Sequence, residues 1–194
     1  MKYLKFVRIA KIKTSPKVCL EIMFDYSHFL FKHKSSFNDF KVISDKNNEQ
    51  IFYYETKIFN FIPWSPVRQF IAIKKLIPEK QKFHQIYLDL ASKNVFFFRC
   101  SMTNKGENVK IIHEVNIPVS NFLYIFRKIL LIIINKKFDV MWHEDKEMLN
   151  QLYLKKDFKN IQCFAKNYNL ENIFYKEFDK HFDQNKKPDL LIDT

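Results

Sequence analysis

Residues 109–154 read VKIIHEVNIPVSNFLYIFRKILLIIINKKFDVMWHEDKEMLNQLYL, and the period of the apolar residues changes within this stretch. Before Pro118 apolar and polar residues alternate, which is typical of a β-strand with one buried face. From about Ser120 to Leu154 the apolar residues recur every three or four positions, which predicts a helix with Ser120 or Asn121 as its N-cap. At 1.5 Å per residue this helix is about 50 Å long. The fold class follows from this change from a strand to one long final helix.

Upstream of this stretch, alternating runs are separated by turn-type clusters. Gly106, the only glycine, lies in one of these clusters, where a turn favours a positive φ. The opening run, Lys5–Lys13, leads into Ser15-Pro16, which is a typical helix start. The residues from Lys17 to about Lys34 then predict one broken helix or two short helices. The later runs predict an antiparallel meander with strands at Phe40–Ser44, Ile51–Phe59, Val67–Ile77, Phe83–Leu90, Val95–Met102 and Val109–Ile117.

The predicted element order is one strand, a short helix pair, about six further strands and a long helix. This order predicts an α+β domain over residues 1–156, in which a curved antiparallel sheet of about seven strands wraps around the C-terminal helix. It resembles the START-like (SRPBCC, helix-grip) superfamily, in which a ligand lies between the sheet and the last helix. The resemblance implies a cavity for a hydrophobic small molecule. Residues 157–194 are polar and are expected to form a C-terminal extension that is partly helical or flexible.

Composition limits the partners that the chain is expected to have. Lys and Arg outnumber Asp and Glu by 33 to 21, and the net charge of +12 attracts anionic membrane surfaces. The basic residues are mostly scattered lysines without a recognisable nucleic-acid module, so no specific nucleic-acid partner is expected. The three cysteines form no CxxC pair, which favours a reducing compartment.

Two segments bear on the location of the protein: the N-terminal residues and the apolar run Phe122–Ile134. The N-terminal residues lack the uninterrupted apolar region of a signal peptide, and a cytoplasmic location, with peripheral membrane contact as an option, is expected. The run Phe122–Ile134 contains Arg127 and Lys128 and is shorter than the roughly 20 residues of a membrane span. It is expected to be a buried or interfacial helix segment.

The sharpest local motif is Asp25-x-x-His28-x-x-x-x-His33, in the helical region after the first strand. Two imidazoles and a carboxylate are the ligand set of non-haem Fe(II) oxygenases. Residues five apart lie about 140° apart around a regular helix, so His28 and His33 could not both face one metal ion on such a helix. The segment must therefore kink or end between them. Asp145 falls on the apolar stripe of the long helix, where a buried carboxylate needs a cation, a donor or a proton.

These residues, with Trp142-His143-Glu144-Asp145 on the last helix, resemble the catalytic iron domain of Rieske-type ring-hydroxylating oxygenases. By this resemblance His28, His33 and Asp145 would bind iron, and Asp25 would orient a ligand imidazole from the second shell of the site. No cysteine is followed by His at the spacings that a Rieske cluster needs, so this chain holds no such cluster. Electrons would come from an electron-transfer protein.

Purely structural roles for the same residues, without metal binding, stay open. His28 and His33 would then be a capping and a surface histidine, and Asp145 would pair with a lysine or with His143. His84 and His113 lie in the phase of apolar residues and are expected to be hydrogen-bonded core histidines or to line the cavity. Trp142 is a further candidate for the cavity.

Tyrosine and tryptophan side chains are also expected in the wall of the cavity, and the candidates are Tyr53, Tyr54 and Trp64.

The sequence supports hydroxylation of an apolar, cyclic small molecule by a non-haem iron oxygenase as the first hypothesis for the function. The alternatives are a non-enzymatic carrier of a lipid or other hydrophobic small molecule, and a metal-free cyclase or dehydratase. Whether the chain is an enzyme is left open.

Overall fold

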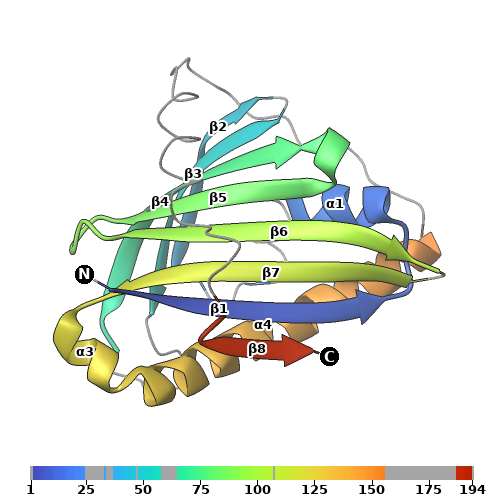
Figure 1. The fold of residues 1–194 in the computed structure, drawn as a ribbon. Coiled ribbons are helices and arrows are strands. Elements are labelled where there is room, and N and C mark those ends of the chain that lie inside the picture. Colours follow the sequence, from blue (N-terminus) through green and yellow to red (C-terminus); the bar gives the residue numbers. More distant parts are fainter. Residues whose placement is uncertain are drawn as a thin grey trace.

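The computed structural model describes residues 2–24, 33, 37–46, 48–57, 65–106, 108–155 and 187–193, with the backbone alone at 148, 150–155 and 193. Figure 1 shows one curved sheet beside a long helix. The elements are β1 (Lys2–Ile12), α1 (Pro16–Phe24), β2 (Asp39–Lys46), β3 (Glu49–Lys57), β4 (Val67–Ile77), η1 (Pro78–Lys80), β5 (Lys82–Asp89), β6 (Val95–Lys105), β7 (Asn108–Val119), α3 (Asn121–Ile125), α4 (Arg127–Lys155) and β8 (Leu190–Asp193).

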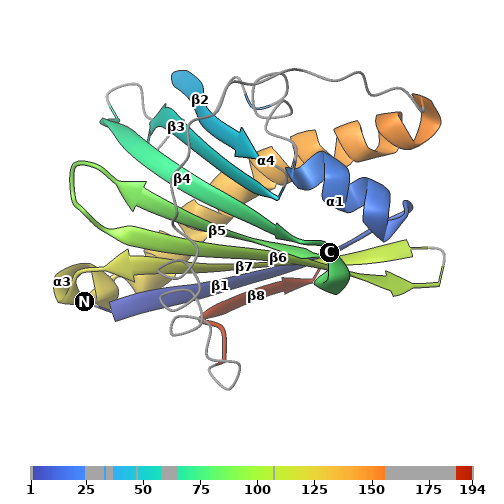
Figure 2. The same ribbon diagram turned by 90° about the horizontal axis from the view of Figure 1, so that it is seen from above.

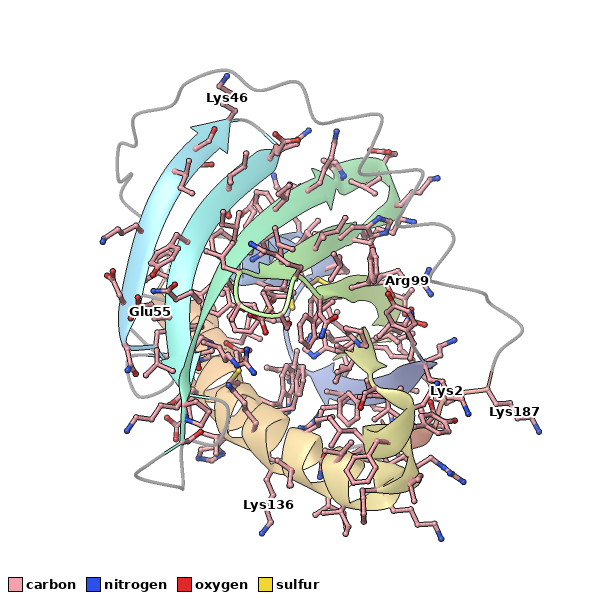
Figure 3. The ribbon with its side chains drawn as sticks, turned by 90° about the vertical axis from the view of Figure 1, so that its left-hand side faces the viewer. Lys2, Lys46, Glu55, Arg99, Lys136 and Lys187 are labelled. Carbon is pink, nitrogen blue, oxygen red and sulfur yellow. The ribbon has the colours of Figure 1, made fainter. Side chains whose placement is uncertain are left out.

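The strands form a single sheet in the order β2-β3-β4-β5-β6-β7-β1-β8. Strands β2 to β7 are a continuous antiparallel meander, and β1 pairs antiparallel with β7, with Phe6 opposite Val115. Strand β8 adds in parallel on the other side of β1, where Leu190 lies opposite Phe6. Figures 2 and 3 show the sheet twisting and curving around α4. The predicted helix-grip architecture is therefore confirmed.

Local sequence signals account for the element boundaries. The Ser15 hydroxyl accepts a hydrogen bond from the Val18 amide at 3.2 Å and caps α1. The Ser120 hydroxyl accepts from the Leu123 amide at 3.1 Å and caps α3. Gly106 adopts a φ of 65° in the turn between β6 and β7, a conformation that glycine adopts without strain. The predicted single helix is interrupted at Phe126, so that it begins as the short α3 and continues as α4.

The inner side of α4 packs against the concave face of the sheet. Leu131, Trp142 and Leu149 are buried at helical spacing. The Phe138 ring stacks on Phe6 of β1 with centroids 5.1 Å apart. The buried guanidinium of Arg8 donates to the Asp139 carboxylate at 2.6 Å and so ties β1 to the helix.

Two expectations concern the ends of the domain. The first helix of the predicted pair is α1, whereas most of the segment expected to hold the second lies outside the described residues. The C-terminal extension contributes β8 to the sheet, a strand that the sequence prediction did not include; most of the extension is not described. No helix in the described part of the chain is long and apolar enough to cross a membrane.

Candidate functional site

A cavity of about 230 Å³ lies between the concave face of the sheet and the inner side of α4. Its walls come from strands β3 to β7, from α1 and from α4, and Figure 3 looks along the curved sheet that surrounds it. The lining residues are mostly apolar: Met23, His33, Phe37, Phe52, Tyr54, Thr56, Phe70, Lys74, Phe83, Gln85, Tyr87, Phe96, Phe98, His113, Val115, Ile117, Lys137, Phe138, Met141, Trp142 and Asp145.

Strand alternation gives the cavity its aromatic wall. Every second residue of a strand points to the same face, so Phe52, Tyr54 and Thr56 of β3 line the cavity together. The Tyr54 ring stacks on Phe70 of β4 at 5.1 Å and meets Tyr87 of β5 edge-on at 6.0 Å. Burial raises the pKa of both tyrosines far above the ordinary value, which keeps their hydroxyls neutral.

One end of the cavity holds a cluster of an imidazole and two carboxylates. His33 is fully buried; its Nε2 lies 2.9 Å from Asp145 Oδ1, and its Nδ1 lies 2.5 Å from Glu144 Oε2. Burial lowers the pKa of His33, but the hydrogen bonds and charges of Asp145 and Glu144 outweigh it, and the pKa lies above the ordinary value. The pKa of Asp145 is raised by burial, against the opposing effect of His33. The geometry favours an imidazolium held between two carboxylates.

Lys74 is a second buried cation near this cluster. Its ammonium donates to the backbone carbonyls of Met23 and Phe24 at 2.6 and 3.1 Å, and so binds the C-terminal end of α1, where cations are stabilised. It also lies 4.6 Å from the centre of the Phe83 ring. The charge of Lys74 lowers the pKa of Asp145, which places the two groups in one electrostatic network.

Lys137 supplies a cation at a different part of the cavity wall. Its Nζ donates to Thr56 Oγ1 at 3.2 Å and to the Lys57 carbonyl at 3.1 Å. Burial lowers the pKa of Lys137 to about 8. No carboxylate within the described ranges pairs with this ammonium, so a polar or anionic ligand group would be stabilised beside it.

His113 and Trp142 also line the cavity. The His113 ring lies edge-on to Trp142 at 5.6 Å and tilted against Phe98 at 5.5 Å. Burial, with a smaller effect of Arg8, lowers the pKa of His113 to about 3, so the imidazole is neutral. Among the described residues its Nε2 has no hydrogen-bond partner, which leaves it available to a ligand.

The structure corrects the expectation that Tyr53 and His84 line the cavity, although the buried His84 agrees with the alternative of a core histidine. Trp64 lies outside the described residues. Tyr53 alternates with the lining residues of β3 and points to the other face of the sheet, where its hydroxyl donates to Glu55. His84 is buried, but the residues of β5 that line the cavity are Phe83, Gln85 and Tyr87, which point to the other face of the strand. Both errors have one cause: these strands carry apolar or aromatic residues on both faces, so the sequence pattern does not show which face is inside.

The described part of the motif does not supply an iron site. No group of three His, Cys, Asp or Glu side chains in the described ranges could hold a metal ion. Both ring nitrogens of His33 meet carboxylates, and its raised pKa favours a protonated ring without a lone pair for a metal. Asp25 and His28 lie outside the described residues. The ligand set of His28, His33 and Asp145 therefore stays a prediction, and no chemical step is derived through iron.

The polar residues of the cavity that the sequence did not single out include Lys74, Gln85 and Lys137. Lys74 shares the phase of Phe70 and Ala72 on β4, and Gln85 lies midway between two aromatic residues of its strand, so alternation could have indicated them. Lys137 sits beside Lys136 in a basic pair, which has the appearance of a solvated helix face. Only the packing of α4 separates the two lysines into an inner and an outer one.

Comparison of the sequence with protein-family models and with curated proteins gives no match. The fold, in contrast, is shared with many solved structures. The Zhui aromatase/cyclase from a Streptomyces species matches with a TM-score of 0.60 at 6% identity, over 77% of this chain and 95% of that one. A START superfamily protein from Mycobacterium smegmatis gives 0.56 at 9% identity, over 76% and 98%. Norcoclaurine synthase from Thalictrum flavum gives 0.57 at 10% identity, over 77% and 87%.

At these identities the likeness concerns the fold. What is shared is the arrangement of a curved sheet around a long C-terminal helix. This chain therefore has the START-like helix-grip fold, and the resemblance seen in the element order is confirmed at that level.

Proposed function

We propose that this chain binds a hydrophobic small molecule in the cavity between the sheet and α4. The observation that supports this function is the cavity itself, which combines an aromatic wall with a few buried polar groups. Ligand pockets have this composition, because apolar walls supply affinity while a few polar atoms fix the orientation of the ligand. The function is that of a carrier or receptor for such a molecule, with no chemical step.

The polar groups specify the ligand further. The Lys137 ammonium offers an N–H donor at one place, and the neutral His113 offers its Nε2 at another. A molecule with a flat or chain-like apolar body and one oxygen-bearing acidic or carbonyl group fits this set. The acidic group would lie against the Lys137 ammonium and the body against Phe52, Tyr54 and their neighbours.

Binding of a neutral fluorescent probe, N-phenyl-1-naphthylamine, tests the function. Val115 lines the cavity, and Val115→Trp should fill part of it and abolish the fluorescence increase that the probe shows with the native chain. Val67→Trp is the matched control, because Val67 is 43% exposed and lies outside the lining. Circular dichroism checks that both variants stay folded, since overpacking costs about 1–3 kcal/mol. Equal probe binding by the two variants would contradict the proposal.

A metal-free cyclase or dehydratase is a second candidate, favoured by the amine and the imidazole in the cavity. Lys137, with a pKa of about 8, and the neutral His113 could transfer protons to and from a bound ketone near neutral pH. An aldol-type ring closure followed by loss of water needs no more than such transfers. Lys137→Gln and His113→Gln should then abolish turnover of a short aromatic diketone while probe binding is kept. Unchanged turnover, or none by the native chain, would leave the carrier function.

A further inference from the structure

The outer face of α3 and of the first half of α4 exposes large apolar side chains. Seven of the ten exposed large hydrophobic residues in the described part of the chain lie between residues 122 and 140. We refer to these seven as the outer patch: Phe122, Leu123, Ile125, Phe126, Ile129, Ile132 and Val140. Phe122 and Ile125 are 68% and 70% exposed, and Ile129 and Ile132 are 57% and 59% exposed. Exposed apolar groups that gather in this way mark an interaction surface.

Helical spacing explains why the outer patch is continuous. Residues three or four positions apart lie on the same side of a helix, and this spacing relates Ile125, Ile129, Ile132, Lys136 and Val140. The side that faces the sheet is a different one, which carries the buried Leu131 and Trp142. Figure 3 shows the Lys136 side chain pointing away from the sheet, on the side of α4 opposite the cavity. Both sides of α4 are thus apolar, and only one of them is packed against described residues.

Around the part of the outer patch that lies before residue 138, the charged side chains are all basic, whereas Asp139, beside Val140, is bound to Arg8. No Asp or Glu occurs from residue 115 to residue 138, whereas Arg127, Lys128 and Lys136 are exposed within this span. Lys2 of β1 adds to them: its ammonium lies 4.6 Å from the centre of the Tyr124 ring, and Arg127 lies 5.2 Å from the same ring. A second copy of the chain would bring a like-charged surface against this one, with the net charge of +12 on each copy. The charge therefore favours an anionic partner.

We infer that the outer patch binds the surface of a membrane that contains anionic lipids. Helices that lie in the plane of a membrane interface typically carry apolar side chains together with Lys and Arg on their exposed surface. The isoleucines and phenylalanines enter the boundary of the acyl chains, and Arg127, Lys128 and Lys136 meet the anionic headgroups. The inference rests on exposure and charge alone and is independent of what the cavity holds.

Vesicle co-sedimentation tests the inference with the full chain. The protein should sediment with vesicles of phosphatidylcholine that contain 30% phosphatidylserine, and much less with phosphatidylcholine alone. Binding should weaken as the salt concentration rises, because salt screens exposed charges. Arg127→Gln/Lys128→Gln should weaken binding to the anionic vesicles roughly thirtyfold, the effect expected for two basic residues at such a surface. Ile129→Ser/Ile132→Ser should weaken binding to a comparable degree.

The controls are exposed residues on other elements. Lys80→Gln/Lys105→Gln removes the same charge from the last residues of η1 and β6, and β6 ends at the opposite end of the sheet from α3 (Figure 1). Ile43→Ser removes a similar apolar group from β2, the edge strand farthest from β1 in the sheet order. Both control variants should bind as the native chain does. Equal losses in the control and patch variants would overturn the inference. So would a native dimer that Ile129→Ser/Ile132→Ser converts to a monomer, because a second copy would then cover the patch.

A dye at the patch gives an independent readout. Cys19 and Cys100 are buried, so Ile129→Cys on a Cys163→Ser background can carry a single polarity-sensitive label. Its emission should shift to the blue on addition of anionic vesicles. A shift already complete in the absence of vesicles would show that the chain itself, or another copy, covers Ile129, and would overturn the inference.

Discussion

Lowering the pH from 7 to 5 should destabilise this protein through His113, and the variant His113→Phe should lack that effect. Burial, with a smaller effect of Arg8, lowers the pKa of His113 to about 3 in the folded chain, whereas an unfolded histidine titrates near 6.5. Below pH 6.5 the unfolded chain therefore binds more protons than the folded chain. Stability is fully present above pH 6.5 and is lost as the pH falls toward 3. With these two pKa values, linkage predicts a loss of about 2 kcal/mol between pH 7 and pH 5.

Urea unfolding at pH 7, 6 and 5, followed by far-ultraviolet circular dichroism, measures this loss. Phenylalanine fits the position, since the ring would lie between Phe98 and Trp142 at the wall of the cavity. The quantity to compare is the change in unfolding free energy with pH, because the substitution also changes packing. Stopping at pH 5 keeps most carboxylates ionised, and the effect of the buried His84 is the same in both proteins.

His143→Gln is the matched control, because the His143 side chain is 77% exposed and lies outside the cavity. This variant should lose as much stability between pH 7 and pH 5 as the native chain. His113→Phe should lose about 2 kcal/mol less. If all three proteins lost the same unfolding free energy between pH 7 and pH 5, His113 would not be a buried neutral imidazole. It could then not act as a hydrogen-bond acceptor for a ligand in the cavity.

Three further results are expected. Asp145→Leu should cost about 3–5 kcal/mol, because it removes one carboxylate partner of the buried His33, while His33→Leu/Asp145→Leu should cost less; urea unfolding of both variants would contradict the pairing if the double variant were the less stable one. The raised pKa of His33 contributes stability that is fully present below pH 6.5 and is lost as the pH rises through its folded value, so the native chain should lose stability there and His33→Leu should not. Ser120→Ala should lower stability by about 1 kcal/mol in thermal unfolding through loss of the helix cap, and an unchanged midpoint would show that α3 does not depend on that cap.

Most of the fold could be predicted because its signals are local. Alternation marks each strand of the meander, Ser120 caps α3 at the start of the predicted long helix and Gly106 marks a hairpin, so the bounds of these elements are predicted to within a few residues. Strand β8 was missed because it is four residues long and pairs with β1 about 180 positions away. No local pattern reports a contact of that separation.

The candidate site was only partly predictable, because its composition depends on which face of each strand is inside. Asp145 was placed correctly toward the interior by the helical phase of its apolar neighbours, and the structure brings it to His33. For β3, aromatic residues at both Tyr53 and Tyr54 made the two faces look alike, and the choice between them depends on pairing with β2 and β4. The strand phase could have indicated that Lys74 faces the cavity, but its hydrogen-bond acceptors lie at the end of α1 and are set by the tertiary structure.

The central claim is that the space between the sheet and α4 holds a hydrophobic small molecule. Titration with N-phenyl-1-naphthylamine tests it most directly, by fluorescence, for the native chain, Val115→Trp and Val67→Trp. A probe that buries roughly 300 Å² of apolar surface gains about 7 kcal/mol, which corresponds to a dissociation constant on the order of 10 µM. Saturable binding near that value by the native chain and Val67→Trp, and its loss in folded Val115→Trp, is the predicted result. Absence of saturable binding by the native chain, or full binding by Val115→Trp, would contradict the claim.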